Sequence, residues 1–460
     1  MRYLYLPIEI AIREFDSKLC LAEAASRQGW DVVIGLKRDL LEISHSLPPG
    51  IFLVKSCVPG ELQQLTEIRT NGHRVVSLDE EGLVTYPRFL RDEVRFNAET
   101  LEAVDAIFSW GQFQADVLRE VYPKARKKIH VTGNPRLEIW HRHTPTLHAQ
   151  NAEMLRDKHG PFILFASGFG IANNYMKSKS GLELTVKHSG NIDSHTVDFL
   201  TGQHTQNTLV FHEYLKLIPK LLEALPDYKV VIRPHPSEAH SEWQSIADKF
   251  DNAILEYDGP ITPYILAASA LLQFKSTTSV EAHFIGRRSV TYLPKLPDEL
   301  LQFNLPLPLA FSAVGRSIEQ TILLLKDAVD NRKPVDVETL PDDAKKWIAY
   351  GHGHVPSQKI VEHMSSLAIE TDRTLKIPKP RLFHSIKIKR IASKFLAMLP
   401  EQKVFLTQII TKAKSERDYG RHKLRGLSLE IGQQTLEAIN PKRQQKLKRF
   451  YKNLFHLPPE

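Results

Sequence analysis

Short apolar runs alternate with helix-like segments in two successive blocks of this chain, and this alternation limits the folds open to it. In the first block, helical apolar spacing occurs at 19–28, 60–69 and 113–121. Such alternation is typical of βαβ units, which form a parallel sheet with helices on both faces. The strands predicted from the first block are 3–6, 31–36, 51–54, 74–78, 106–109 and 129–131.

The second block begins after a polar, His-rich stretch at 136–160, which we interpret as a linker or a connecting helix. The weak periodicity of residues 175–205 predicts an insertion or a mobile loop. Helices expected at 316–330 and 340–370 would close the second block or pack back on the first. The strands predicted here are 162–166, 229–232, 253–256, 270–274 and 289–292, with helices at 209–225 and 279–285.

The two blocks predict an α/β fold class with two Rossmann-like parallel-sheet domains. A chain of 460 residues is too long for a single hydrophobic core, which agrees with this division. The predicted domains are 1–150 and 151–370, followed by a basic helical extension at 371–460.

The positive charge of the chain belongs to this extension. The whole chain has a formal net charge of +8, but residues 371–460 contain 21 Lys and Arg against 7 Asp and Glu. The rest is therefore net negative, and a nucleic-acid partner is not expected. Apolar residues interleaved with basic ones at 386–399 predict an amphipathic helix. It would bind an anionic membrane surface, or pack on the protein with a solvated basic face.

The cysteine content and the hydropathy indicate a cytoplasmic location. Cys20 and Cys57 are the only cysteines, which argues against a disulfide framework. The apolar start of the chain is short and charged residues follow at once, so it predicts a first strand and no signal peptide. No stretch approaches the ~18 uncharged apolar residues of a membrane span. Attachment to the inner membrane would have to come from the basic extension.

Three carboxylates, Asp79, Glu80 and Glu81, stand before Gly82 just after a predicted strand. Ligands of open α/β sheets bind at the carboxyl ends of the strands. Crowded like charges raise at least one carboxyl pKa, which suits general acid–base work, and a carboxylate can also be a nucleophile. Alternatively, these residues cap a helix N-terminus.

A rigid loop follows the strand predicted at 229–232. It contains Arg233, His235, Pro236 and Glu238, and its two prolines hold the chain in an extended bend. A guanidinium fork and a ring N–H donor suit an anionic ligand. The alternative is a tight strand-to-helix turn with solvated polar residues.

Four hydroxyl residues, Ser276, Thr277, Thr278 and Ser279, follow another predicted strand and open a helix. Hydroxyls and backbone N–H groups at such a position can bind an anion, although simple capping needs only one of them.

Two further loops, which contain Asn134 and Gly168, follow strands where the backbone can approach a ligand or simply turn. The 20 histidines show no metal-binding spacing, so no metal or other cofactor is predicted.

Taken in this order, the motifs resemble the GT-B-fold glycosyltransferases that use CMP-activated acidic sugars, such as sialyltransferases and Kdo transferases. The chain more closely resembles a bacterial family of surface carbohydrate biosynthesis proteins. The resemblance covers roughly 1–370 and excludes the basic extension. It rests on six short segments: 7–9, 13–18, 78–82, 108–111, 131–136 and 233–238.

The resemblance implies a GT-B-like fold whose two domains face a central cleft, and a function for each motif. Glu81, Glu80 or Asp79 would be the catalytic carboxylate, as a base with inversion or as a nucleophile with retention. Arg13 and Lys18 would contact the acceptor or the donor carboxylate, or would be surface charges. The nucleotide and its phosphate would be bound by Arg233, His235, Pro236, Glu238, Ser276, Thr277, Thr278, Ser279, Gly168 and Asn134.

The function implied is metal-independent transfer of Kdo or a related acidic sugar from a CMP-activated donor to a surface glycan or glycolipid. A UDP-sugar 2-epimerase or a CDP-polyol enzyme would share the architecture. A non-catalytic scaffold that binds a glycolipid through the basic extension is a further alternative, and it predicts that Glu80 and Glu81 are replaceable.

Overall fold

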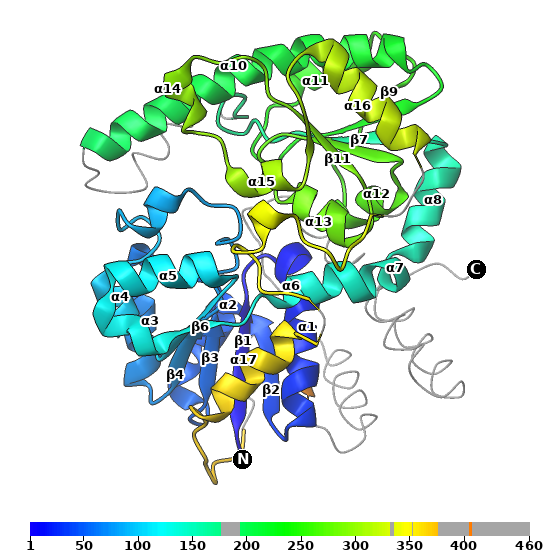
Figure 1. The fold of residues 1–460 in the computed structure, drawn as a ribbon. Coiled ribbons are helices and arrows are strands. Elements are labelled where there is room, and N and C mark those ends of the chain that lie inside the picture. Colours follow the sequence, from blue (N-terminus) through cyan, green and yellow to red (C-terminus); the bar gives the residue numbers. More distant parts are fainter. Residues whose placement is uncertain (176–193, 332–334, 352, 376–403, 407–460) are drawn as a thin grey trace, which may run out of the picture. The chain divides into compact units, whose positions relative to one another are not determined.

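The computed structural model describes residues 1–175, 194–331, 335–351, 353–375 and 404–406 (Figure 1). These residues form two compact units. The first unit contains residues 1–139 and the described residues from 345 onward, and the second contains the described residues of 140–344. Residues 176–193, and most of the predicted helical extension, lie outside the described residues.

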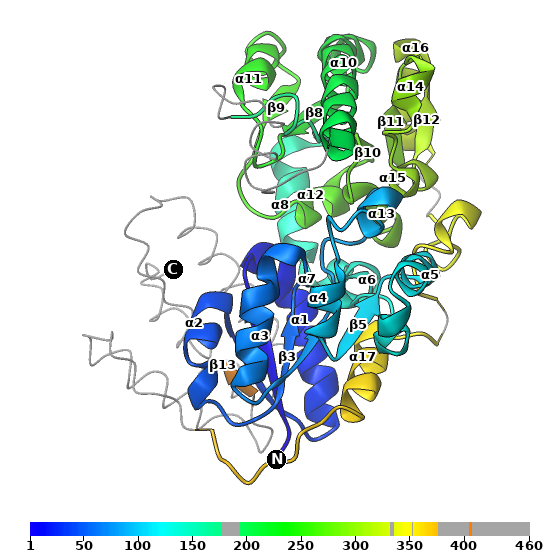
Figure 2. The same ribbon diagram turned by 90° about the vertical axis from the view of Figure 1, so that its left-hand side faces the viewer.

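The first unit is built on a seven-stranded sheet with the strand order β13-β2-β1-β3-β4-β5-β6, in which every pair is parallel. Strand β1 is buried along its whole length, because helices cover both faces of a parallel sheet (Figure 2). The strands are β1 (Tyr3–Ile8), β2 (Asp31–Leu36), β3 (Ile51–Val54), β4 (Arg74–Ser77), β5 (Ala106–Ser109), β6 (Ile129–Val131) and β13 (Val404–Leu406).

The helices of this unit begin directly after the strands or after short loops, as the βαβ pattern predicts. They are α1 (Ala11–Arg27), α2 (Lys37–Glu42), α3 (Leu62–Thr70), α4 (Ala98–Glu102), α5 (Gln112–Val121), α6 (Pro135–Glu138) and α17 (Pro356–Ser365). Short 3₁₀ turns are η1 (Ser44–Ser46), η2 (Pro59–Glu61), η3 (Pro87–Leu90) and η4 (Pro123–Lys128).

The segment that starts at residue 345 returns to the first unit. Its Ala349 N–H donates to the Trp110 carbonyl over 2.7 Å. A Cβ at Gly111 would lie 2.3 Å from the Trp347 carbonyl carbon, so only glycine fits beside this segment. Helix α17 then packs against α1 and α6, and Ser357 Oγ donates to Glu138 over 2.8 Å.

The second unit has a six-stranded parallel sheet with the order β12-β11-β10-β7-β8-β9. Its strands are β7 (Phe162–Ala166), β8 (Lys229–Arg233), β9 (Ala253–Leu255), β10 (Ala270–Gln273), β11 (Ser289–Tyr292) and β12 (Ala313–Gly315). Its helices are α7 (Thr144–Leu147), α8 (Ala149–His159), α10 (Ser194–Ala224), α11 (Ser241–Ala247), α12 (Thr262–Ala267), α13 (Thr278–Phe284), α14 (Asp298–Leu301), α15 (Pro306–Ala310) and α16 (Ile318–Asp330). The π-helix η5 (Ile139–His143) and the turn η6 (Asp342–Ala344) complete the list.

The predicted α/β class with two Rossmann-like parallel-sheet units is confirmed. Several details of the structure differ from the prediction. Residues 194–205, expected in a loop, belong to α10. Most of 340–355 is not helical, and β12 was not predicted. The described residues from 345 onward belong to the first unit, which is the alternative left open for 340–370, whereas the predicted boundaries put 345–370 in the second domain and the residues from 371 in the extension.

Helix α10 begins fifteen residues earlier than its apolar periodicity predicts. Its first turns pack through a few isolated side chains, chiefly against the Phe303 ring, and such contacts leave no periodic apolar pattern in the sequence. Phe199 packs edge-on against Phe303, with 5.0 Å between the ring centroids. A Cβ at Gly202 would lie 2.2 Å from the same ring, so this glycine allows a close approach inside the helix.

No helix in the described part of the chain is long and apolar enough to cross a membrane.

Candidate functional site

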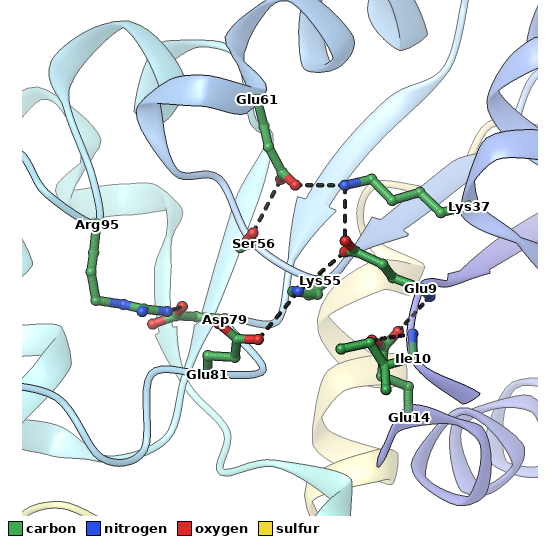
Figure 3. Close-up of polar contacts among 10 residues, drawn as sticks. All are labelled: Glu9, Ile10, Glu14, Lys37, Lys55, Ser56, Glu61, Asp79, Glu81 and Arg95. Atoms are coloured by element: carbon green, nitrogen blue, oxygen red, sulfur yellow. Dashed lines mark hydrogen bonds and ion pairs between the residues drawn. The ribbon is translucent and has the colours of Figure 1, made fainter. Parts of the chain in front are cut away.

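Four charged residues follow four neighbouring strands of the first sheet, at the carboxyl edge (Figure 3). Lys37 follows β2, Glu9 follows β1, Lys55 follows β3, and Glu81 lies in the loop after β4. Because the strand order is β2-β1-β3-β4, the charges alternate in sign along the edge. We call these four residues the charged row.

Ion pairs connect the members of the charged row. Lys55 Nζ lies 3.1 Å from Glu9 Oε2 and 3.2 Å from Glu81 Oε1. Lys37 Nζ lies 3.7 Å from Glu9 Oε2 and 2.6 Å from Glu61 Oε1, and Glu61 also accepts a hydrogen bond from Ser56. Each lysine therefore bridges two carboxylates.

The carboxylates of Glu9 and Glu81 are the more exposed members of the row. Their side chains are 44% and 52% exposed, whereas those of Lys37 and Lys55 are 20% and 15% exposed. Partial burial raises the pKa of Glu9, but the lysine contacts outweigh it and the net pKa is lowered. Burial lowers the pKa of Lys55, but Glu81 and Glu9 outweigh it and the net pKa is raised.

Asp79 builds the turn that carries Glu81. Its backbone has a positive φ of 45°, and its carboxylate is buried against Arg95 and Gln114. The Gly82 N–H donates to the Asp79 carbonyl over 2.8 Å. A Cβ at Gly82 would lie 1.9 Å from Asp79 Oδ2, so the turn requires glycine there. Asp79 was predicted as a catalytic candidate, and we assign it instead to holding this turn.

Glu80 points into the protein, where it meets Lys18. The Lys18 Nζ lies 3.1 Å from Glu80 Oε1, and the two side chains are 0% and 4% exposed. Lys18 is therefore not a surface charge, because it is enclosed with Glu80, and its contact with a ligand stays a prediction. Arg13 is exposed at the start of α1, and its predicted function is untested.

Glu9 and Glu14 were missed as site residues. The buried carboxylate of Glu14 accepts hydrogen bonds from the backbone N–H groups of Glu9 and Ile10, each over 3.0 Å (Figure 3). Burial raises the pKa of Glu14. The first strand was predicted to end at residue 6, two residues early, so Glu9 did not stand at a predicted strand end. The pairing of β1 with β2 shows that Glu9 directly follows a strand end, since the two strands end opposite each other at Ile8 and Leu36.

In the second unit, Glu238 joins the loops that follow β7 and β8. Its Oε1 accepts from the N–H groups of Phe169 and His235 over 2.9 and 3.0 Å. Its Oε2 accepts from Ser167 Oγ and Trp243 Nε1 over 2.7 and 3.0 Å. Burial raises the pKa of Glu238 despite these four donors. The predicted ligand contact is replaced by this function inside the loops.

Arg233 is also engaged within the unit. Its two terminal nitrogens donate to the carbonyls of Asp258 and Gly259 over 2.7 and 2.8 Å, and its guanidinium lies over the Tyr264 ring. The side chain thus fixes the loop after β9, where we had expected a ligand contact.

His235 and Pro236 are exposed at the tip of the β8 loop. The His235 Nδ1 lies 2.7 Å from Ser237 Oγ and accepts from the Ser237 N–H over 3.2 Å, an arrangement that fits a neutral ring with its proton on Nε2. A Cβ at Gly170 would lie 2.0 Å from Ser237 Oγ, which places the glycine loop directly against this tip.

Gly168, from the same loop, faces the end of β10. A Cβ there would lie 2.3 Å from the Phe274 carbonyl oxygen, so this glycine allows two loops of the protein to meet. The hydroxyl cluster follows, and part of it serves the backbone. Ser276 Oγ accepts from the Thr278 N–H over 3.2 Å, and Ser279 Oγ donates to the Ser276 carbonyl over 3.0 Å. Thr277 is half-buried beside them.

Lys275 was not predicted as a site residue. It has a positive φ of 49° and donates to Gln206 Oε1 on α10. Burial lowers its pKa to about 7. With Phe274, Thr291 and Asn304 it lines a small cavity.

Asn134, predicted at the nucleotide site, lies in the first unit and is fully buried. Its Oδ1 accepts from the Arg136 N–H over 2.9 Å and caps α6. Capping accounts for Oδ1, whereas the buried Nδ2 of Asn134 has no hydrogen-bond partner within the described residues.

No family model matches the chain, and no curated protein matches it. Among solved structures, the UDP-GlcNAc 2-epimerase of Methanocaldococcus jannaschii has a TM-score of 0.49 and 11% identity, over 80% of this chain and 100% of that one. The Neisseria meningitidis UDP-GlcNAc 2-epimerase has 0.48 and 14% over the same shares. The wall teichoic acid polymerase TagF has 0.43 and 11%, over 79% and 88%. Likenesses at this level carry no inference about the reaction of this chain.

Proposed function

We propose that this chain is a nucleotide-sugar-dependent glycosyltransferase and that Glu81 is its catalytic carboxylate. One observation carries the choice of residue. Asp79 and Glu80 are buried and engaged by Arg95 and Lys18, whereas Glu81 is half exposed at the carboxyl edge of the sheet. That edge is where ligands of open α/β sheets bind.

Two reaction courses fit a carboxylate held in this way. As a base, Glu81 would accept the proton of the attacking acceptor hydroxyl. As a nucleophile, it would form a bond to the anomeric carbon while the bond from that carbon to the nucleotide phosphate breaks; the acceptor hydroxyl would then displace Glu81 and lose its proton to the released phosphate. In both reaction courses, Lys55 orients the Glu81 carboxylate through an ion pair in which Nζ lies 3.2 Å from Oε1.

In the second unit, we propose that His235 binds the nucleotide phosphate. A neutral ring with its proton on Nε2 can donate to a phosphate oxygen and stabilise the charge that develops when the sugar leaves. Thr277 and the neighbouring hydroxyls would add donors at the end of β10. The resemblance of the sequence motifs supports a CMP-activated acidic sugar, Kdo or a related one, as the donor and a surface glycan as the acceptor.

The donor is tested by thermal shift with CMP, CDP, UMP and UDP on the wild-type chain and on His235→Ala. A nucleotide that binds only the folded protein raises its melting temperature. We expect stabilisation by CMP that is lost in the variant. Stabilisation by UDP or CDP alone would refute the CMP donor and favour the epimerase-like or polyol-phosphate chemistry instead.

The catalytic residue is tested with Glu81→Gln. We expect at least about a hundredfold loss of kcat in sugar transfer from the donor that the nucleotide screen selects, because an amide is neither a base nor a nucleophile. Glu67→Gln, an exposed carboxylate on α3, is the matched control and should retain full activity. If Glu81→Gln is as active as this control, Glu81 is not the catalytic group.

A further inference from the structure

The carboxyl edge of the first sheet presents hydrogen-bond acceptors to an approaching ligand. Glu9 and Glu81 are roughly half exposed, and the two lysines of the charged row are more buried than they are. Lys55 is already shared between Glu9 and Glu81, and Lys37 between Glu9 and Glu61. The positive charges of the row are therefore matched within the protein.

Part of each of these two carboxylate side chains reaches solvent. The ion pairs of the row involve Glu9 Oε2 and Glu81 Oε1, and the side chains of Glu9 and Glu81 remain 44% and 52% exposed. An ionised carboxylate can only accept hydrogen bonds, so its natural partners are hydroxyl groups, and an anionic group would be repelled.

The backbone beneath these oxygens is held in place. Glu14 binds the N–H groups of Glu9 and Ile10, and the Glu80 N–H donates to the Lys55 carbonyl over 2.9 Å. The lowered pKa of Glu9 keeps it ionised at neutral pH. Two charged acceptors on either side of one ammonium group thus require little ordering when a ligand binds.

We propose that Glu9 and Glu81 together bind hydroxyl groups of an uncharged sugar, which makes Glu9 a specificity-determining residue for a neutral acceptor. This inference rests on the proposed function, since it names the acceptor class for the same edge.

The direct test is ligand-observed NMR with two sugars of the same ring configuration, D-galactose and D-galacturonic acid, on the full chain. We expect wild type to bind D-galactose at least about tenfold more tightly than D-galacturonate. In Glu9→Gln, we expect galactose binding to weaken several-fold and this preference to fall, because the amide removes the repelling charge. Glu67→Gln should behave as wild type. Equal binding of both sugars by wild type would overturn the inference, as would a preference unchanged in Glu9→Gln.

A kinetic readout separates the acceptor from the donor. In Glu9→Gln, we expect KM for the acceptor to rise while KM for the donor stays the same. A rise confined to the donor would refute the assignment to the acceptor. The nucleotide screen does not involve Glu9, so the two proposals can fail separately. Nucleotide binding without sugar discrimination defeats only this inference, whereas sugar discrimination without any nucleotide binding defeats the transferase function.

Discussion

Asp79, Glu80 and Glu81 are consecutive in sequence but have three different surroundings. Asp79 is buried against Arg95, Glu80 is enclosed with Lys18, and Glu81 reaches the surface beside Lys55. The sequence identified the acidic cluster and its place after a strand. It could not rank the three residues, because their partners come from 16 to 62 positions away in the chain.

The enclosed pair of Lys18 and Glu80 predicts a strongly non-additive effect on stability. Lys18→Met leaves a buried carboxylate without its cation and should cost about 3–5 kcal/mol of unfolding free energy. The double variant Lys18→Met, Glu80→Leu removes both charges and should recover most of this loss. Urea unfolding of the single and double variants measures the coupling. Equal stability of Lys18→Met and wild type would show that the pair carries no such energy.

Lys275 predicts a pH dependence of stability. Its pKa is about 7 in the folded chain and near 10.5 when unfolded, so the unfolded state binds more protons between these values. The free energy of unfolding is therefore highest, as far as Lys275 is concerned, at high pH. It falls as the pH is lowered from about 10.5 towards 7, by up to about 1.4 kcal/mol per pH unit. Lys275→Met should remove this dependence and be the more stable protein at pH 7.5. The difference between the two unfolding curves across pH 7.5–10 measures it, and a constant difference would contradict the assignment.

At the scale of elements, the candidate site residues lie in the loops that follow the strands. The strands of both sheets were predicted to within two residues, apart from β12 and β13, because buried β-branched runs are a strong signal. The loops were harder to interpret. Arg233 and Glu238 look like ligand contacts in sequence, yet both bind backbone groups of neighbouring loops. Nothing in a single sequence distinguishes a polar residue that binds a ligand from one that fixes the loop beside it.

We therefore expect a single substitution of Glu238 to disturb two loops, those that follow β7 and β8. In Glu238→Gln, the amide nitrogen would face N–H or O–H donors, leaving groups of the β7 and β8 loops unpaired. We expect a loss of about 2–4 kcal/mol in stability and weaker nucleotide binding, because His235 would no longer be held. Ser167→Ala, which removes only one donor, should cost about 1 kcal/mol. Unfolding and nucleotide titration of both variants provide the comparison, and equal effects would contradict a central function of Glu238.

At the scale of the whole molecule, the sequence predicted two parallel-sheet units but did not decide on which of them residues 340–370 pack. Where this segment packs depends on close contacts that a single sequence does not display. One is the contact of Gly111 with the Trp347 backbone, which leaves no room for a Cβ. The segment from 345 is a part of the first unit because the loops after β5 and β6 are shaped to receive it.

This return has a consequence for synthesis on the ribosome. The first unit is made of residues from before 140 and after 344, so helix α17 is synthesised only after residues 140–344 of the second unit. The described part of the second unit is continuous and can fold before α17 has been made. Until then, the face of α1 that α17 covers in the folded protein lacks this helix.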